Sequence, residues 1–226
     1  MAVTVVNIRD AIKSVVLDGY YTDAAIDVWI DDAMQAVAGG IVMPDGDISP
    51  PLPELYSIGT VNTSTTNPYV DLPDDYQRAV FYVSDSTGYR IHPVMGGDYY
   101  SFNLFINHAI KKDLTTKGSV DAVCVKGRRI YYQGIPSAST TLSVQYYRNP
   151  DGLEGIPEHL VKQILKHWVC KEIFGEGIED GEDNSGKGQA YHEKKFYEFM
   201  ETLRQFIGID AEPEYYGVAG TERSDW

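Results

Sequence analysis

The sequence is poor in cysteine and in basic residues, and it has no long hydrophobic run. Two cysteines, Cys124 and Cys170, are too few for a disulfide framework and are typical of a reducing compartment. No stretch approaches the roughly 18 apolar residues of a membrane span. The N-terminus lacks the basic and apolar segments of a secretory signal. We therefore expect a soluble protein of the cytoplasm or of a particle, with no membrane segment.

Negative charge dominates what is there. The chain of 226 residues carries 19 Lys and Arg against 33 Asp and Glu, which gives a net charge of −14. Nucleic-acid binding through phosphates depends on Lys and Arg that release counterions. This balance argues against a protein that grips DNA, and it predicts that the chain repels DNA that passes near it.

Helical periodicity is confined to the two ends of the chain. Apolar residues recur at steps of three and four from Ile8 to Val16, and again after Thr22, a good N-cap, up to Gly39. Near the C-terminus one helix is expected to begin at Pro157, and a final one ends at Gly208. The apolar face of that final helix is Phe196, Phe199, Met200, Leu203, Phe206 and Ile207.

Strand-like alternation fills the middle of the chain. The expected strands are Tyr56 to Val61, Tyr69 to Leu72, Gln77 to Val83, Tyr89 to Val94, Val120 to Val125, Arg129 to Gln133 and Thr141 to Tyr147. Short turns between pairs of them favour hairpins and an antiparallel sheet. A short helix from Asp98 to Asn107 is expected to interrupt them.

These patterns predict an α+β fold in which N- and C-terminal helices form a bundle and the centre forms an antiparallel β-sheet region. The expected divisions are a helical hairpin over 1–43, a mainly β region over 44–155, C-terminal helices over 156–208 that pack with the N-terminal ones, and a tail over 209–226.

The segment Gly181 to Gly188 resembles a phosphate-binding loop but fails on chemistry. Gly188 replaces the hydroxyl that binds magnesium, the segment follows a helix rather than a strand, and Glu182 and Asp183 would repel phosphate. A calcium loop fits no better, because its glycine falls one position late, at Gly186, and its twelfth position is Tyr191. We expect a solvated acidic loop from Gly175 to Gly188 instead.

No residue pattern supports a metal centre, a cofactor or catalysis. His167 and Cys170 lie three apart on an expected helix, but a zinc site needs about four ligands and no second pair completes it. We expect a half-buried Cys170 and a His167 that faces the surface or a partner. Cys124 lies in an alternating strand and fits a core face.

Three groups of residues are candidates for contacts with other proteins. The tail carries Tyr215, Tyr216 and Trp226, aromatic side chains of the kind enriched at interfaces. Basic residues Lys126, Arg128 and Arg129 could face the acidic C-terminal third of a second copy in a head-to-tail assembly. The acidic candidates, for a contact between subunits or for a channel wall, are Glu176, Glu179, Asp180, Glu182 and Asp183.

Three stretches resemble the head-to-tail adaptor (connector or neck) proteins of tailed bacteriophages, which include the tail tubular adaptors. The first runs from Thr22 to Val37 with its Trp29-Ile30 pair. The second runs from Tyr69 to Arg78 and contains Leu72-Pro73-Asp74. The third is the run Arg129, Tyr131, Ile135-Pro136, Leu142, Tyr146-Tyr147, Pro150 and Leu153.

The resemblance implies a non-enzymatic virion protein of the phage neck, assembled in the host cytoplasm. It implies a ring of about twelve copies below the portal protein, closed by side-to-side contacts. Such a ring extends the DNA channel, lets double-stranded DNA pass without specific binding during ejection, and offers an attachment surface to tail or neck proteins. It also implies that the C-terminal tail docks on the portal.

Two other hypotheses remain open from the sequence. The chain could be another virion or assembly component, such as a tail-completion or baseplate protein. It could also be an enzyme or a protein that binds a small ligand, although no motif supports that reading.

Overall fold

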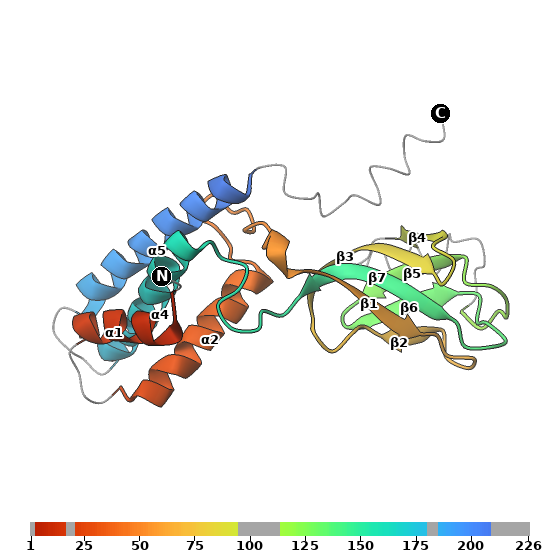
Figure 1. Cartoon of the computed structure of the whole chain (residues 1–226), viewed down its shortest axis with the longest axis horizontal. Coiled ribbons are helices and arrows are strands. Elements are labelled where there is room, and N and C mark those ends of the chain that lie inside the picture. The colour runs from red at the N-terminus through yellow and green to blue at the C-terminus, as the bar shows by residue number, and fades with distance from the viewer. Residues whose placement is uncertain (1–2, 17–20, 95–113, 180–184, 209–226) are drawn as a thin grey trace. The chain divides into compact units, whose positions relative to one another are not determined.

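The computed structural model describes residues 3–16, 21–94, 114–179 and 185–208 (Figure 1). In these ranges the chain forms four α-helices, which are α1 Val5–Val16, α2 Asp23–Gly39, α4 Glu158–Glu179 and α5 Ser185–Ile207. The strands are β1 Tyr56–Asn62, β2 Tyr69–Asp71, β3 Tyr76–Asp85, β4 Arg90–Val94, β5 Ala122–Lys126, β6 Arg129–Gln133 and β7 Thr141–Arg148. The predicted α+β fold class is confirmed.

The chain divides into a helical unit and a β unit. Among the described residues, the helical unit joins those up to Leu55 with those from Asn149 to Gly208, and the β unit comprises Tyr56–Arg148. The helical unit is therefore built from two segments that lie far apart in the sequence, whereas the described part of the β unit is one continuous segment.

Helix α4 is the central element of the helical unit, because it contacts α1, α2 and α5. Its buried face includes Ile164, Leu165 and Val169. Thr22 caps α2 as its sequence predicts, since the Thr22 hydroxyl accepts a hydrogen bond from the Ala25 amide at 3.3 Å. At the other end of the unit, α5 stops before Gly208, whose φ of 91° favours glycine.

Two sequence predictions for the helical unit are wrong. The expected acidic loop from Gly175 to Gly188 is shorter, because α4 continues to Glu179 and α5 already begins at Ser185. Phe206 does not join the buried face of α5: it is 62% exposed, with its ring 5.5 Å from that of His159. Its position in the last turn of the helix places it beyond the core that Phe196, Met200 and Leu203 form.

The strands of the β unit form a sheet in the order β1-β7-β3-β4-β5-β6-β2. All neighbours are antiparallel, as predicted, except β4 and β5, which are parallel. A parallel pair needs a long connection, and the chain from Val94 to Ala122 supplies it. The helix expected from Asp98 to Asn107 lies in that connection, outside the described residues.

The core of the β unit comes mainly from alternate residues of its strands, although β5 buries three in a row, Ala122, Val123 and Cys124. Val83, Val123, Ile130 and Val144 are fully buried there. Tyr132 and Tyr146 are buried too, and each hydroxyl finds a partner. Cys124 is buried without a disulfide, as its place in a strand predicts.

Candidate functional site

The acidic candidates of the helical unit begin at the C-terminal end of α4. Glu176 is exposed, and the Tyr21 hydroxyl lies 3.4 Å from its carboxylate. Glu179 is the last residue of α4 rather than part of a loop. Asp180, Glu182 and Asp183 lie outside the described residues, and the role proposed for this group stays a prediction.

The basic candidates lie at the turn between β5 and β6, and Arg128 has a contact within its own chain. Its guanidinium donates to the backbone carbonyls of Asp74 at 3.0 Å, Tyr76 at 3.1 Å and Pro73 at 3.3 Å. It also lies over the Tyr76 ring, 5.9 Å from the centroid. Arg128 therefore fixes the loop that joins β2 to β3.

Arg129, at the start of β6, likewise pairs within the β unit. Its guanidinium donates to the Asp71 carboxylate at 3.0 Å and lies 4.5 Å from the centre of the Tyr69 ring. The hydrogen bond to Asp71 raises the pKa of Arg129. Lys126 ends β5 on the other side of the turn. Asp71 ends β2, and the loop that follows carries Asp74 and Asp75. The structure therefore places the Asp71 carboxylate against this basic turn in the same copy.

The loop held by Arg128 contains the Leu72-Pro73-Asp74 stretch, and residues of this loop also contact the core of the β unit. Leu72 is buried, and the Tyr146 hydroxyl donates to the Asp75 carboxylate at 2.5 Å. Burial and the neighbouring carboxylate raise the pKa of Tyr146 to about 12. This stretch therefore shapes the entry into β3, which is a structural role.

The tail candidates Tyr215, Tyr216 and Trp226 lie outside the described residues, so their docking role stays a prediction. The first half of the segment that resembles a phosphate loop, residues 181–184, also lies outside the described residues. Its second half, residues 185–188, belongs to α5. In the described part of the chain, no three His, Cys, Asp or Glu side chains gather as a metal site.

A pair of buried histidines is a feature that the sequence analysis missed. His167 of α4 and His192 of α5 are 6% and 4% exposed, and their Nδ1 atoms lie 2.8 Å apart. The prediction that His167 faces the surface or a partner is therefore wrong. The signal was available, since His192 lies one helical turn before Phe196, on the same face of α5.

The histidine pair lies among aromatic rings. His167 stacks on Phe199 with ring centres 5.7 Å apart, and His192 stacks on Phe174 at 5.5 Å. Burial, with the neighbouring His192, lowers the pKa of His167 to about 4, and burial lowers that of His192 as well. Cys170 is fully buried rather than half-buried as predicted, and burial raises its pKa to about 12, which keeps it a thiol.

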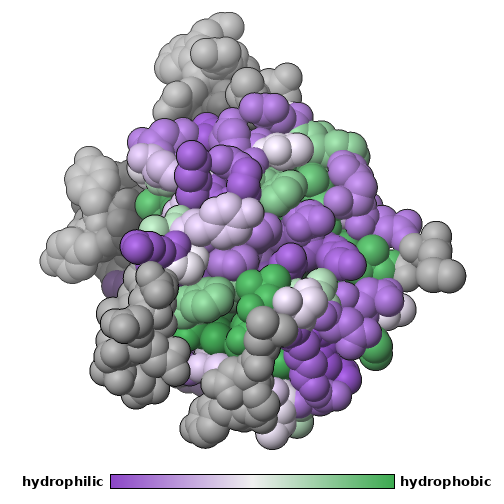
Figure 2. Space-filling view, turned by 90° about the vertical axis from the view of Figure 1, so that its left-hand side faces the viewer, coloured by the Kyte–Doolittle hydropathy of each residue, from purple (hydrophilic) through white to green (hydrophobic). Residues whose placement is uncertain are grey.

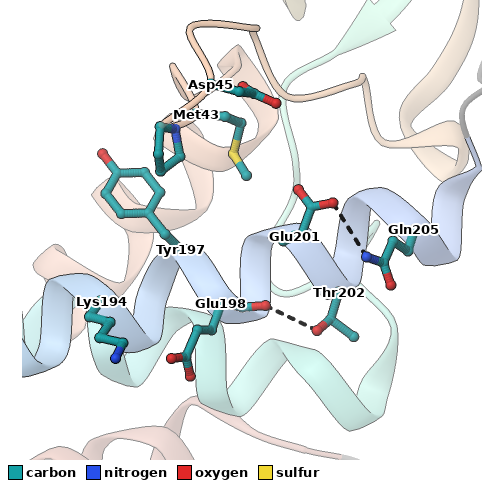
Figure 3. A pocket seen from close by; sticks show the side chains of 9 residues that line it. Met43, Asp45, Lys194, Tyr197, Glu198, Glu201, Thr202 and Gln205 are labelled. Atoms are coloured by element: carbon teal, nitrogen blue, oxygen red, sulfur yellow. Dashed lines mark hydrogen bonds between the residues drawn. The ribbon is translucent and has the colours of Figure 1, made fainter.

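A groove lies beside α5, on the side of a small hairpin that follows α2. The hairpin spans residues 41–49 and is closed by a bridge between Val42 and Ile48. The Arg204 guanidinium binds the Asp45 carboxylate at 2.5 Å and the Asp47 carboxylate at 3.0 Å, which fastens the hairpin tip to α5. The groove between them has a volume of about 610 Å³. It is lined by Met43, Pro44, Asp45, Lys194, Tyr197, Glu198, Glu201, Thr202 and Gln205 (Figure 3).

Large apolar side chains are exposed near this groove. Val42 and Ile48 on the hairpin are 62% and 58% exposed, as is Phe206 at 62% near the end of α5. On the face drawn in Figure 2, hydrophobic surface also gathers below the centre and is bordered by hydrophilic surface. Apolar surface with a polar border is typical of regions where proteins contact one another.

Comparison with known proteins identifies the family. A family model described as SU10 adaptor protein matches residues 3–221, which is nearly the whole chain. A search of curated proteins finds no match. No helix in the described ranges has the length and apolar character to cross a membrane. The chain therefore belongs to the SU10 adaptor protein family, and its resemblance to the head-to-tail adaptors of phages is confirmed.

Proposed function

We propose that this protein is a ring-forming head-to-tail adaptor of the phage neck. The ring sits below the portal, extends the DNA channel and presents the attachment surface for tail or neck proteins. The observation that carries this proposal is the family match over residues 3–221. A phage adaptor is a virion protein that contacts other head and tail proteins, and the ring, the channel and the ejection path are the further steps that we propose.

The charge of the chain supports the DNA conduit. A channel that passes duplex DNA must not hold it, and a net charge of −14 per subunit repels phosphates. The repulsion acts over a screening length of about 8 Å at physiological salt. Glu176 and Glu179 on α4, with Asp180, Glu182 and Asp183, are the candidates that we propose for the channel wall or for contacts between subunits.

The bonds that Arg128 and Arg129 make within their own subunit limit what they can contribute to a contact between subunits. Because Arg129 pairs with Asp71 at 3.0 Å, a contact with an acidic neighbour would have to compete with that ion pair. An exposed ion pair of this kind contributes little to stability. We therefore propose that apolar contacts supply most of the energy between subunits and that Lys126, Arg128 and Arg129 set their orientation.

The test is reconstitution with the portal protein of the same phage. Purified protein is mixed with portal rings, and the product is imaged by electron microscopy. We expect a stoichiometric collar on the tail-facing end of the portal, with an open channel. The absence of any association at micromolar concentration would contradict the proposal. A monomer in the absence of portal would not, since binding to a partner can drive assembly.

Deletion of residues 209–226 tests the tail. The proposed docking role of Tyr215, Tyr216 and Trp226 predicts that the shortened protein stays folded and binds the portal more weakly. Loss of the fold would show instead that the tail is part of the core.

A further inference from the structure

We propose that the groove between α5 and the hairpin of residues 41–49 binds a basic, partly apolar segment of another protein. This inference rests on the proposed function only for the identity of the partner, which would be a neighbouring protein in the phage neck. The chemistry of the groove itself rests on the residues that line it.

The groove is a built feature of the helical unit. Arg204 binds both Asp45 and Asp47, and the backbone amide of Met43 donates to the Asp47 carbonyl at 2.7 Å. The hairpin is thus held in shape and fastened to α5 before any partner arrives. A preorganised site binds with a smaller entropy cost than a loop that must first become ordered.

Apolar atoms form the middle of the groove. Met43 is 3% exposed, and Figure 3 shows Met43 and the Tyr197 ring on the same side of α5. A volume of about 610 Å³ has room for one or two side chains with their backbone. The aliphatic stem of a lysine or arginine, or a leucine beside it, would cover this apolar surface.

The charges around the groove select a cation. Its lining includes three carboxylates, Asp45, Glu198 and Glu201, against one ammonium, that of Lys194. Two of the three have close partners, because Asp45 binds Arg204 at 2.5 Å and Glu198 binds Lys195 at 2.6 Å.

Glu201 is the lining carboxylate with the weakest contacts, so it is the best placed of the three to bind an added cation. Its ion-pair distance to Arg204 is 3.8 Å, and Gln205 donates to it at 3.4 Å, so both contacts are weak. Figure 3 shows Glu201 pointing toward the hairpin, whereas Glu198 and Lys194, which also line the groove, leave α5 in the direction away from the hairpin. A cationic head placed in the groove therefore meets Glu201 first.

The net charge of the chain favours the same partner. At −14, the protein attracts basic segments over a long range and repels acidic ones. Electrostatic attraction alone would act anywhere on this surface. The groove adds an apolar floor, which makes the site specific.

The test uses a fluorescent peptide of alternating lysine and leucine, with an alternating glutamate and leucine peptide as its counterpart. Fluorescence anisotropy measures binding to the full chain, to Glu201→Lys and to Glu193→Lys. Glu193 is an exposed α5 residue outside the groove lining, so its variant has the same net charge as the groove variant. Circular dichroism verifies that both variants are folded.

We expect the basic peptide to bind and the acidic peptide not to bind. Glu201→Lys should weaken binding by about tenfold, because it replaces an attraction by a repulsion, and Glu193→Lys by about twofold or less. A neutral variant, Glu201→Gln, should lie between the two. Raising the salt from about 0.05 M to about 0.3 M should weaken binding to the natural chain.

Three results would overturn the proposal: no binding of the basic peptide, equal binding of the acidic peptide, or equal effects of the Glu201 and Glu193 substitutions. The last would show attraction to net charge only. No portal is needed in this experiment, so its failure is separate from that of the adaptor function. If a collar forms on the portal but the basic peptide does not bind the groove, the adaptor function is supported and the groove proposal is wrong.

Discussion

The helical unit and the β unit bury different kinds of polar group. In the helical unit, His167 and His192 bond to each other between α4 and α5. In the β unit, the buried hydroxyls of Tyr132 and Tyr146 bond to the Asn67 carbonyl and to Asp75. Imidazoles gain a charge in mild acid, whereas tyrosines stay neutral up to high pH. The two units should therefore differ in their response to acid.

They also differ in how the chain builds them. The helical unit packs α1 and α2 against α4, from the other end of the sequence, whereas the described β unit is continuous. Contacts between distant segments are slow to form because a long loop must close first. The β unit can form its sheet before α4 and α5 have been synthesised.

The largest test of this separation is a cavity in one unit. Phe196 of α5 is fully buried and meets Trp168 of α4 with ring centres 5.2 Å apart. We expect Phe196→Ala to lower the free energy of unfolding of the helical unit by about 4 kcal/mol. Hydrogen exchange read residue by residue should show lost protection in α4 and α5.

The amides of β5 and β6 serve as the internal control for this variant. If the two units are independent, their protection should stay unchanged. An equal loss of hydrogen-exchange protection in both units would show that the chain unfolds as a single cooperative body, and would contradict the independence of the two units.

The next largest effect is expected from acid, which should destabilise the helical unit more than the β unit. Burial lowers the pKa of His167 to about 4, below the ordinary value of about 6.5 in the unfolded chain. The unfolded state therefore binds more protons in acid, and the stability that the neutral ring provides is complete above pH 6.5 and is lost as the pH falls toward 4. For His167 alone we expect a loss of about 2 kcal/mol at pH 5, measured by urea denaturation.

Geometry adds to this loss, because a hydrogen bond between two Nδ1 atoms 2.8 Å apart needs one of them without a proton. The control is His192→Gln, which removes the facing imidazole and should make the loss between pH 7 and pH 5 smaller, while the part caused by the burial of His167 remains. Carboxylates with lowered pKa values, such as Asp45 and Glu198, lose their contribution only below their ordinary values near 4. A profile that is flat for the natural chain in this window would refute the role of the pair.

Much of this architecture was predictable from local pattern. Thr22 with its following apolar stripe indicated α2, and alternation indicated the seven strands of the described residues, because both signals lie within one element. Pairings between elements were harder to predict. His167 looked like a surface residue because its partner His192 lies 25 positions away on a separate helix, and no spacing rule connects residues across such a gap.

The candidate site shows the same limit. Arg128 and Arg129 were recognisable as a basic turn, but their engagement with the Pro73 and Asp74 carbonyls and with Asp71 comes from the β2 register. The groove was not foreseen at all. It depends on Arg204 reaching Asp45, 159 positions away, and only the fold brings them together.

A smaller effect is expected from the hydroxyl network of the β unit. Tyr132 is fully buried, and its hydroxyl accepts from the Ser64 amide at 2.7 Å and donates to the Asn67 carbonyl at 2.8 Å. Tyr132→Phe keeps the ring but removes the hydroxyl, so these two backbone groups lose their partner. We expect the free energy of unfolding to fall by about 1.5 kcal/mol. Urea denaturation should show this loss equally at pH 7 and pH 5, in contrast to the histidine pair, and a loss that grows in acid would contradict the assignment.

The smallest test returns to the helical unit and asks whether its N-terminal half can be weakened alone. Thr22 caps α2 through its hydroxyl, which is solvent-exposed and accepts from the Ala25 amide at 3.3 Å. Thr22→Ala should cost about 1 kcal/mol, whereas Thr22→Ser keeps the hydroxyl and should cost a few tenths. Because α2 contacts α4, the loss should appear as reduced hydrogen-exchange protection in α2 and α4 together. Protection lost only in the first turn of α2 would contradict this expectation and would mean that this end of the helix frays on its own.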